Sequence, residues 1–312
     1  MKLSIIIPCL NEEEMIPIFF KEVASHLEQL PVVPEYIFID DGSTDRTLAE
    51  IKKLHHQYPD QLHFISFSRN FGKEAAIYAG LQASTGDLVC LMDADLQDPP
   101  RLLKEMYALI TEEGYDCVGT KRTNRQGEPY FRSFFANRFY KLMQKVSKTP
   151  IELGERDFRM MTRQVVDSVL TLTEYNRFSK GLFNWVGFKK CYLSYDNQER
   201  VAGETSWSFI GLVKYSLEAL IDFSDMPLTF VSLLGIGSCV LSGLALLFII
   251  IRTLINGDPT PGWPSLVCII LFVGGLQLLS LGIVGKYISK IFLETKKRPI
   301  YLIRERDKVK EK

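Results

Sequence analysis

The sequence predicts an α/β fold in which a doubly wound, mostly parallel sheet is followed by an interfacial amphipathic helix and a two-helix transmembrane hairpin. Three observations predict this order. Short apolar runs alternate with helical stretches up to about residue 120, acidic residues directly follow two of these runs, and two long uncharged stretches lie near the carboxyl end. Alternating strands and helices are typical of parallel sheets, which bind ligands at the carboxyl ends of their strands.

The first predicted strand, residues 3–8, leads into an amphipathic helix over 12–29, for which Asn11 is the expected N-cap. This apolar start is too short for a signal peptide, so we expect no cleavable signal. Further strands are predicted at 36–39, 62–67, 88–92 and 117–120, with helices at 45–56, 73–83 and 100–113. Beyond residue 120 the alternation loosens, and arginines are scattered through stretches of helical character.

Two carboxylates one residue apart follow the fourth strand. Asp93 and Asp95 come directly after a buried apolar run, the amide of Gln97 lies two residues further on, and Pro99 and Pro100 then change the course of the chain. Such a cluster of hard oxygen ligands suits Mg²⁺ or Mn²⁺ that carries phosphate groups.

A second acidic pair, Asp40 and Asp41, follows the second strand, where Gly42 permits a tight turn. A carboxylate here can accept a hydrogen bond from the ring N–H of a nucleotide base. An Asx turn that caps the next helix would explain Ser43 and Asp45, but it would not explain the doubled acid. Both pairs fall on the predicted ligand edge of the sheet.

Two uncharged stretches, residues 230–251 and 266–284, are long enough to span a bilayer, since 22 helical residues cover about 33 Å. Lys and Arg residues concentrate after residue 285, so the positive-inside bias places both chain ends in the cytosol. Residues 207–223 form an amphipathic helix that can lie in the membrane interface or be an ordinary surface helix. Buried helices of a soluble protein are the alternative to the hairpin.

These patterns divide the chain into four parts attached to the cytoplasmic membrane. We expect a cytosolic catalytic domain (1–205), an amphipathic juxtamembrane helix (206–228), the transmembrane pair (229–291) and a basic cytosolic tail (292–312).

The charge balance and the cysteine spacing limit the class of function and the cellular compartment. Lys plus Arg and Asp plus Glu both total 37, and this balance argues against a general nucleic-acid binder. The six cysteines are widely spaced, without a metal-ligand pattern, and indicate buried thiols in a reducing compartment.

With these motifs in order, residues 2–225 resemble the family 2 glycosyltransferases, which have the GT-A fold. The marks are residues 93–100 (DADLQDPP), 69–74 (RNFGKE), 157–159 (DFR) and 223–228 (FSDMPL). Within the family, the chain is most similar to polyisoprenyl-phosphate glycosyltransferases, such as dolichyl-phosphate mannose synthases and bactoprenol glucosyl transferases. The resemblance implies transfer of one hexose from a nucleotide diphosphate sugar to a polyisoprenyl phosphate. UDP-glucose is the expected donor, ahead of GDP-mannose and UDP-N-acetylhexosamines.

The resemblance also implies roles for individual residues. The nucleotide sugar is assigned to Pro8, Asn11, Glu12, Asp40, Asp41, Lys73 and Asp93, and Mg²⁺ or Mn²⁺ to Asp93, Asp95 and Gln97. The acceptor phosphate is assigned to Arg122, Arg125, Arg132 and Arg200. Asp95 and Asp157 are the expected catalytic residues, with Asp157 orienting the acceptor or assisting its deprotonation. An ion pair with Arg156 or Arg159 is the alternative role for Asp157.

Two departures from the family bear on these roles. The family often has Gly-Glu-Ser-Lys in a loop near the site, whereas this chain has Gly-Glu-Thr-Ser at 203–206, so Arg200 is a substitute for the missing charge. The Gln-x-x-Arg-Trp run of processive polysaccharide synthases is absent from the sequence, which favours single transfer. Transfer to a lipid hydroxyl, with Asp157 as a true base, and an inactive membrane scaffold are the alternative functions. Homo-oligomer formation stays open.

Overall fold

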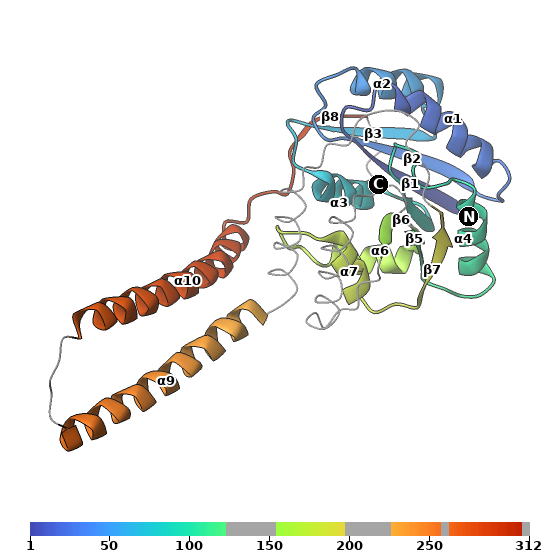
Figure 1. Cartoon of the computed structure of the whole chain (residues 1–312). Helices are drawn as coiled ribbons and strands as arrows, with labels where there is room; N and C mark the ends of the chain where they lie inside the picture. The colour runs from blue at the N-terminus through green and yellow to red at the C-terminus, as the bar shows by residue number, and fades with distance from the viewer. Residues whose placement is uncertain (123–153, 197–225, 257–261, 308–312) are drawn as a thin grey trace. The chain divides into compact units, whose positions relative to one another are not determined.

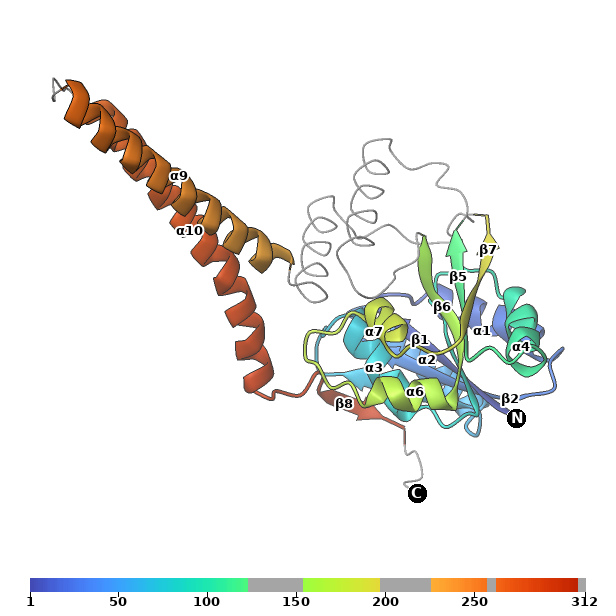
Figure 2. The same cartoon turned by 90° about the horizontal axis from the view of Figure 1, so that it is seen from below.

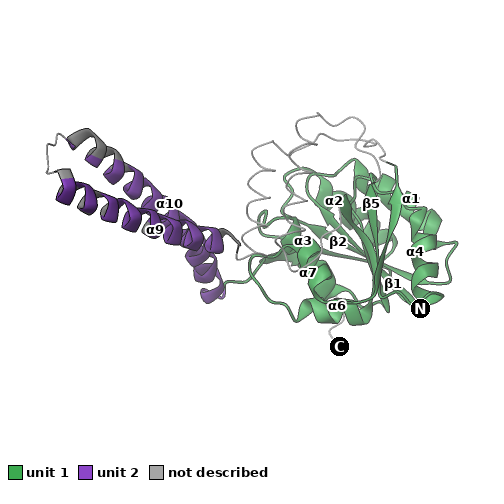
Figure 3. Cartoon of the chain, turned by 60° about the horizontal axis from the view of Figure 1, so that its bottom comes forward, with its two compact units in different colours: residues 1–216, 298–312 green, residues 217–297 purple. Residues whose placement is uncertain are grey.

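The computed structural model describes residues 1–122, 154–196, 226–256 and 262–307. The chain forms two compact units (Figure 3). Unit 1 comprises Met1–Ser216 together with Arg298–Lys312, and unit 2 comprises Leu217–Lys297. Unit 1 carries the sheet, and unit 2 carries two long helices.

Unit 1 is built on an eight-stranded sheet in the order β7-β5-β6-β4-β1-β2-β3-β8 (Figure 1). The strands are β1 (Lys2–Cys9), β2 (Val33–Asp40), β3 (Leu62–Phe67), β4 (Leu88–Leu91), β5 (Cys117–Arg122), β6 (Glu155–Thr162), β7 (Lys190–Tyr195) and β8 (Ile303–Arg306). Among the strands that the structure describes, β6 and β8 run antiparallel to their neighbours and the others pair in parallel. The predicted doubly wound, mostly parallel architecture of GT-A type is therefore confirmed.

Helices cover both faces of the sheet (Figures 1 and 2). The first face carries α1 (Met15–Leu27), α2 (Thr47–Gln57) and α4 (Leu102–Thr111), and the second carries α3 (Lys73–Ala83), α6 (Arg163–Leu170) and α7 (Ser179–Trp185). Because side chains alternate along a strand, Ile5 packs under the first layer and Ile6 under the second. A Cβ at Gly80 of α3 would lie 2.2 Å from Ile6 Cγ2, so only glycine permits this close helix–strand approach.

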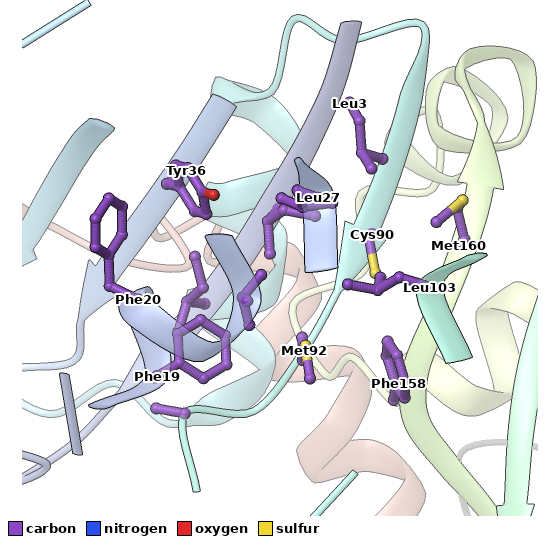
Figure 4. Packing of buried hydrophobic residues seen from close by; sticks show 14 of the residues in the cluster. Leu3, Phe19, Phe20, Leu27, Tyr36, Cys90, Met92, Leu103, Phe158 and Met160 are labelled. Carbon is purple, nitrogen blue, oxygen red and sulfur yellow. The ribbon is translucent and has the colours of Figure 1, made fainter. Parts of the chain in front are cut away.

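The larger core joins the N-terminal strands to β6. Figure 4 shows Phe19 and Phe20 of α1 on one side of this core and Phe158 and Met160 of β6 on the other. Phe19 and Phe158 are fully buried, and each such side chain stabilises the fold by about 1.5–3 kcal/mol relative to exposure. This packing fixes β6, and with it the residues that precede Phe158, against the parallel strands.

The role expected for Asn11 as an N-cap is wrong. Helix α1 begins at Met15, and its N-cap Glu14 makes no side-chain capping bond. Asn11 instead has a positive φ of 54°, and its Oδ1 accepts a hydrogen bond from Thr44 N at 2.9 Å. Asn tolerates this left-handed conformation better than most residues, so Asn11 turns the chain toward the neighbouring loop before the helix starts.

Three strands escape the sequence prediction. β6 carries the buried ion pair Glu155–Arg159, and β8 lies inside the segment expected as a basic tail. β7 lies in the stretch where the alternation had loosened, and it pairs parallel to β5. Charged side chains hide the apolar alternation that marks a half-buried strand, and they are common on edge strands such as β8.

Unit 2 consists, in its described part, of α9 (Met226–Asn256) and α10 (Trp263–Thr295). Both are long and apolar enough to cross a membrane, with mean hydropathies of 1.9 over Leu228–Ala245 and 1.4 over Phe272–Thr295. Their large apolar side chains are exposed rather than covered by described protein. This exposure argues against the alternative of buried helices in a soluble protein. The amphipathic helix predicted before α9 lies almost entirely outside the described residues.

Candidate active site

The sheet changes its winding direction between β1 and β4. β1 pairs with β2 on one side and with β4 on the other, so the chain crosses over β1 after completing β3. In doubly wound sheets, ligands bind outside the carboxyl ends of the strands at such a switch point. Glu12 follows β1 and Asp93 follows β4, and the structure therefore brings both acidic segments to this edge of the sheet.

The loops after β1 and β2 are fastened to each other. Asn11 N donates to Ser43 Oγ at 3.0 Å, and Glu12 N donates to Thr47 Oγ1 at 2.7 Å. Pro8 lies just before them, near the end of β1, in register with Ile39 of β2. These contacts brace the two loops against each other on the side where the nucleotide is expected.

Asp40 and Asp41 brace this side of the sheet edge, and we call the pair the acidic wall. Asp40 accepts hydrogen bonds from Ser43 N at 3.0 Å and from Ser66 Oγ at 2.7 Å. Asp41 accepts one from Gly72 N at 2.9 Å. Both side chains are almost fully buried, and burial raises the pKa of Asp41 above its ordinary value. These contacts brace the loops, and binding of the nucleotide sugar stays a prediction for both Asp40 and Asp41.

Negative charge gathers around the end of β1. Burial first, and then the charges of Glu12, Asp40, Asp93 and Asp45, raise the pKa of the Cys9 thiol well above its ordinary value. Four carboxylates from three loops thus act on one buried point. Such a concentration of negative potential favours a cationic partner at this edge.

The antiparallel pairing of β4 with β6 explains why Asp157 reaches the same edge. Leu91 lies in register with Arg159. If this antiparallel register is continued two residues past Leu91 and two residues before Arg159, Asp93 lies opposite Asp157. No local sequence pattern predicts that Asp93 and Asp157 lie close together, because their proximity depends on β6, which pairs with β4 from more than 60 residues away.

Lys73 connects the two carboxylates, and we call Lys73, Asp93, Asp157 and Lys180 the lysine centre. Lys73 Nζ lies 2.7 Å from Asp93 Oδ1 and 2.5 Å from Asp157 Oδ2. Lys180 Nζ of α7 lies 3.7 Å from Asp157 Oδ1. Both oxygens of Asp157 therefore face an ammonium group.

The ion-pair alternative for Asp157 named the wrong partners. Among the residues that the structure describes, Arg156 pairs with Asp98 at 3.1 Å and Arg159 pairs with Glu155 at 3.1 Å. Asp157 instead pairs with the two lysines.

Charge balance in the lysine centre keeps Asp157 ionised. Burial works to raise the pKa of Asp157, but the charges of Lys180 and Lys73 outweigh it and hold this pKa well below its usual range. Burial raises the pKa of Asp93 despite the nearby Lys73. Burial likewise opposes the charge of Lys73, yet Asp157 and Asp93 raise its pKa overall. The lysine centre is thus a charged group, in which Asp157 is a weak base.

The loop after Asp93 is braced at its far end. Asp95 Oδ1 accepts a hydrogen bond from Gln97 N at 3.1 Å, and Asp98 accepts hydrogen bonds from Arg156 and from the Tyr195 hydroxyl. Arg122, at the end of β5, donates to Gln97 Oε1 at 3.0 Å. The structure therefore brings Arg122, an expected acceptor-phosphate residue, against Gln97, an expected metal ligand.

A divalent cation fits the donors present. Asp93 and Asp95 offer hard carboxylate oxygens one residue apart, and the Lys73 ammonium already lies against Asp93 as a cation would. Within the described ranges, no group of three or more His, Cys, Asp or Glu side chains is arranged to hold a metal by itself. Mg²⁺ is commonly held by one or two carboxylates together with substrate phosphates, and this donor set has that form.

Some predicted site residues lie outside the described part of the chain, and two residues of the site were not predicted. Arg125, Arg132, Arg200 and the 203–206 loop lie outside the described residues. Lys180 and Tyr195 are not predicted as site residues from the sequence, because α7 and β7 show no clear hydrophobic periodicity. Only the tertiary contacts assign them to the site.

Comparison with known proteins gives a consistent match. The family model for glycosyl transferase family 2 matches residues 4–170. The putative glycosyltransferase CsbB of Bacillus subtilis (strain 168) is 43% identical over 303 residues, which cover 97% of this chain and 91% of that protein. The bactoprenol glucosyl transferase of Shigella phage SfX is 42% identical over 310 residues, covering 98% of this chain and 100% of that protein. Among solved structures, the mannosyltransferase PcManGT from Pyrobaculum calidifontis, in complex with GDP-Man and Mn²⁺, has 14% identity and a TM-score of 0.47, covering 95% of this chain and 88% of that chain.

Proposed function

This chain belongs to glycosyl transferase family 2, and we propose that this glycosyltransferase transfers one hexose from UDP-glucose to a polyisoprenyl phosphate. The observation that carries the proposal is the lysine centre, which lies at the switch point of the sheet beside the Asp93–Asp95 motif. The full-length similarity to a protein named bactoprenol glucosyl transferase supports both the acceptor and the sugar. Two helices apolar enough to enter a bilayer support a lipid acceptor.

On the donor side, Asp93 and Asp95, with Gln97 beside them, would hold Mg²⁺ or Mn²⁺. The bound cation would neutralise the charge that develops on the departing nucleotide diphosphate. Lys73 adds fixed positive charge at the same centre, and the braced loops of Asn11 and Glu12 would form the wall against the nucleotide.

On the acceptor side, one phosphate oxygen would attack the anomeric carbon as the bond to the diphosphate breaks, which inverts the configuration. A phosphate monoester loses its second proton near pH 6, so this nucleophile is already largely ionised at neutral pH. Each carboxylate oxygen of Asp157 faces an ammonium group. Asp157 is therefore better suited to orient Lys73 and Lys180 toward the acceptor than to remove a proton from it.

This property of Asp157 distinguishes the proposal from transfer to a lipid hydroxyl. A hydroxyl acceptor has a far higher pKa and needs a general base, and efficient bases have pKa values near the working pH. The low pKa of Asp157 therefore favours the phosphate acceptor. Arg122, together with Arg125, Arg132 and Arg200, would bind that phosphate from the cytosolic side of the cytoplasmic membrane.

The test is a transfer assay with the purified full chain in phospholipid nanodiscs. Radiolabelled UDP-glucose, GDP-mannose and UDP-N-acetylglucosamine are each offered with undecaprenyl phosphate or with diacylglycerol. We expect label to enter the lipid fraction from UDP-glucose alone, and only when undecaprenyl phosphate is present. Mild acid should then release the labelled sugar from the lipid. Labelling of diacylglycerol instead would replace the proposal with the hydroxyl acceptor.

A further inference from the structure

A pocket of about 240 Å³ lies in unit 1 beside the start of α3, and none of its lining residues is a member of the lysine centre. Its walls include Arg69, Phe71, Glu74, Ala75, Arg177 and Ile300. The segments that contribute them lie more than 100 residues apart in the sequence. Arg69, Phe71 and Glu74 belong to the 69–74 motif, but the proposed reaction gives this pocket no role.

Arg177 is the most unusual member of the pocket. Its side chain is only 8% exposed, its guanidinium lies 4.3 Å from the centre of the Tyr78 ring, and one terminal nitrogen donates to the Leu172 carbonyl. Its Nε is buried without a hydrogen-bond partner, and no carboxylate pairs with it, among the residues that the structure describes. Burial lowers the pKa of Arg177 and outweighs the charges of Glu174 and Glu74, which act on this guanidinium without an ion pair. Burying a cation without a directly paired carboxylate is costly, so this position suits an anion.

Arg69 supplies a second guanidinium. It is exposed, lies 3.9 Å from the centre of the Phe71 ring, and donates one hydrogen bond, to the Asn70 carbonyl at 2.8 Å. A guanidinium has five N–H donors, so most of them remain for a ligand. Glu74 brings a carboxylate to the wall, but that carboxylate accepts hydrogen bonds from the backbone and hydroxyl of Ser179.

The chemistry of the walls indicates which anion fits. Two guanidinium groups suit phosphate oxygens, to which arginine can donate two parallel hydrogen bonds. Phe71, Ala75 and Ile300 add apolar surface that suits the carbon atoms beside a phosphate ester. A lipid phosphate has both parts, whereas inorganic phosphate has only one.

The position of Ile300 in the chain points to the bilayer as the source. Ile300 follows Lys297, the last residue of unit 2, by three residues, and the basic run at 296–298 precedes it. Basic segments next to a membrane helix attract anionic headgroups. We propose that the Arg69–Arg177 pocket binds the phosphate of an anionic membrane phospholipid and so holds unit 1 at the bilayer surface.

The test measures binding without turnover, so it is independent of the proposed transfer reaction. The full chain in a neutral detergent is titrated with dihexanoyl phosphatidylglycerol, inorganic phosphate or dihexanoylglycerol, and its unfolding temperature is recorded. We expect phosphatidylglycerol to raise this temperature at far lower concentration than the other two ligands.

The variants Arg69→Gln and Arg177→Gln should each raise the phosphatidylglycerol concentration for half effect about tenfold, because each removes a charged hydrogen-bond donor. Arg304→Gln, which removes an exposed charge of β8 outside the pocket, is the matched control and should respond like the wild type. If Arg177→Gln does not fold, Arg69→Gln decides alone, because its side chain is exposed. An unchanged response in Arg69→Gln, or equal responses to inorganic phosphate and lipid, would overturn the proposal.

Discussion

The acidic wall and the lysine centre use aspartates in opposite ways at one edge of the sheet. Asp40 and Asp41 are 2% and 3% exposed and accept hydrogen bonds from backbone and hydroxyl groups. Asp93 and Asp157 have side chains that are 18% and 20% exposed and meet an ammonium group. A carboxylate that holds a loop serves the fold, whereas an accessible carboxylate balanced by lysine is arranged for charged ligands. Substitutions in the two groups should therefore fail in different ways.

The largest effect is expected at Asp95. Asp95→Ala should lower kcat by about 10³-fold or more without unfolding the domain, since it removes a proposed metal ligand. Excess EDTA should abolish the activity of the wild type to the same extent, and added Mn²⁺ should restore this activity. Asp60→Ala, at an exposed position outside the site, is the control. Full activity in EDTA would remove the metal from the mechanism.

The next effect tests the lysine centre as one unit. Asp157→Asn and Lys73→Met should each lower kcat by about 10²-fold, because each breaks the arrangement that presents positive charge to the acceptor. Kinetics of the two single variants and the double variant form a double-mutant cycle. Losses much smaller than additive in the double variant are expected, and simple additivity would show that the two residues act separately.

Asp41→Ala should produce the contrasting failure. It leaves the backbone N–H groups of Phe71 and Gly72 without their acceptor, at a cost of about 1–3 kcal/mol in the free energy of unfolding. Chemical denaturation measures this loss directly. Activity of the remaining folded protein should fall less than in Asp95→Ala. A variant that is fully stable but inactive would place Asp41 with the catalytic carboxylates instead.

The smallest effect concerns a carboxylate–cation pair outside the site. His63 Nδ1 lies 2.6 Å from Asp307 Oδ2 beside β8, and this hydrogen bond is the main cause of a raised His63 pKa. Because the folded pKa exceeds the unfolded value of about 6.5, the pair stabilises the fold fully below that pH. This contribution is lost as pH rises through the folded pKa.

Thermal unfolding and amide exchange of β8 between pH 5.5 and about 8.5 measure this dependence. Asp307→Asn should flatten the dependence while leaving the pH profile of turnover unchanged. If the profile of turnover moved with it, the pair would belong to the reaction rather than to the fold.

The sequence predicts the acidic motifs and the parallel strands because both are local patterns. Asp93 and Asp95 follow an apolar run directly, and β1 to β5 alternate with helices. The family resemblance assigns Lys73, Asp93 and Asp157 to the site, but neither their contacts nor Lys180 could be predicted. Lys73 and Asp157 are 84 residues apart and meet through the register of β6. β8 was likewise hidden, because its charged sequence resembles a solvated tail until Asp307 bonds to β3. Long-range register has no signature in a single sequence.

The structure of the lipid product tests the central claim most directly. The product made from UDP-glucose and undecaprenyl phosphate by the wild-type chain is isolated and studied by ³¹P and ¹H NMR. The proposed reaction predicts a single glucose in a phosphodiester, with the β configuration that inversion of an α-linked donor gives. A glucose on a hydroxyl oxygen, a chain of several sugars, or an α-linked phosphodiester would contradict it.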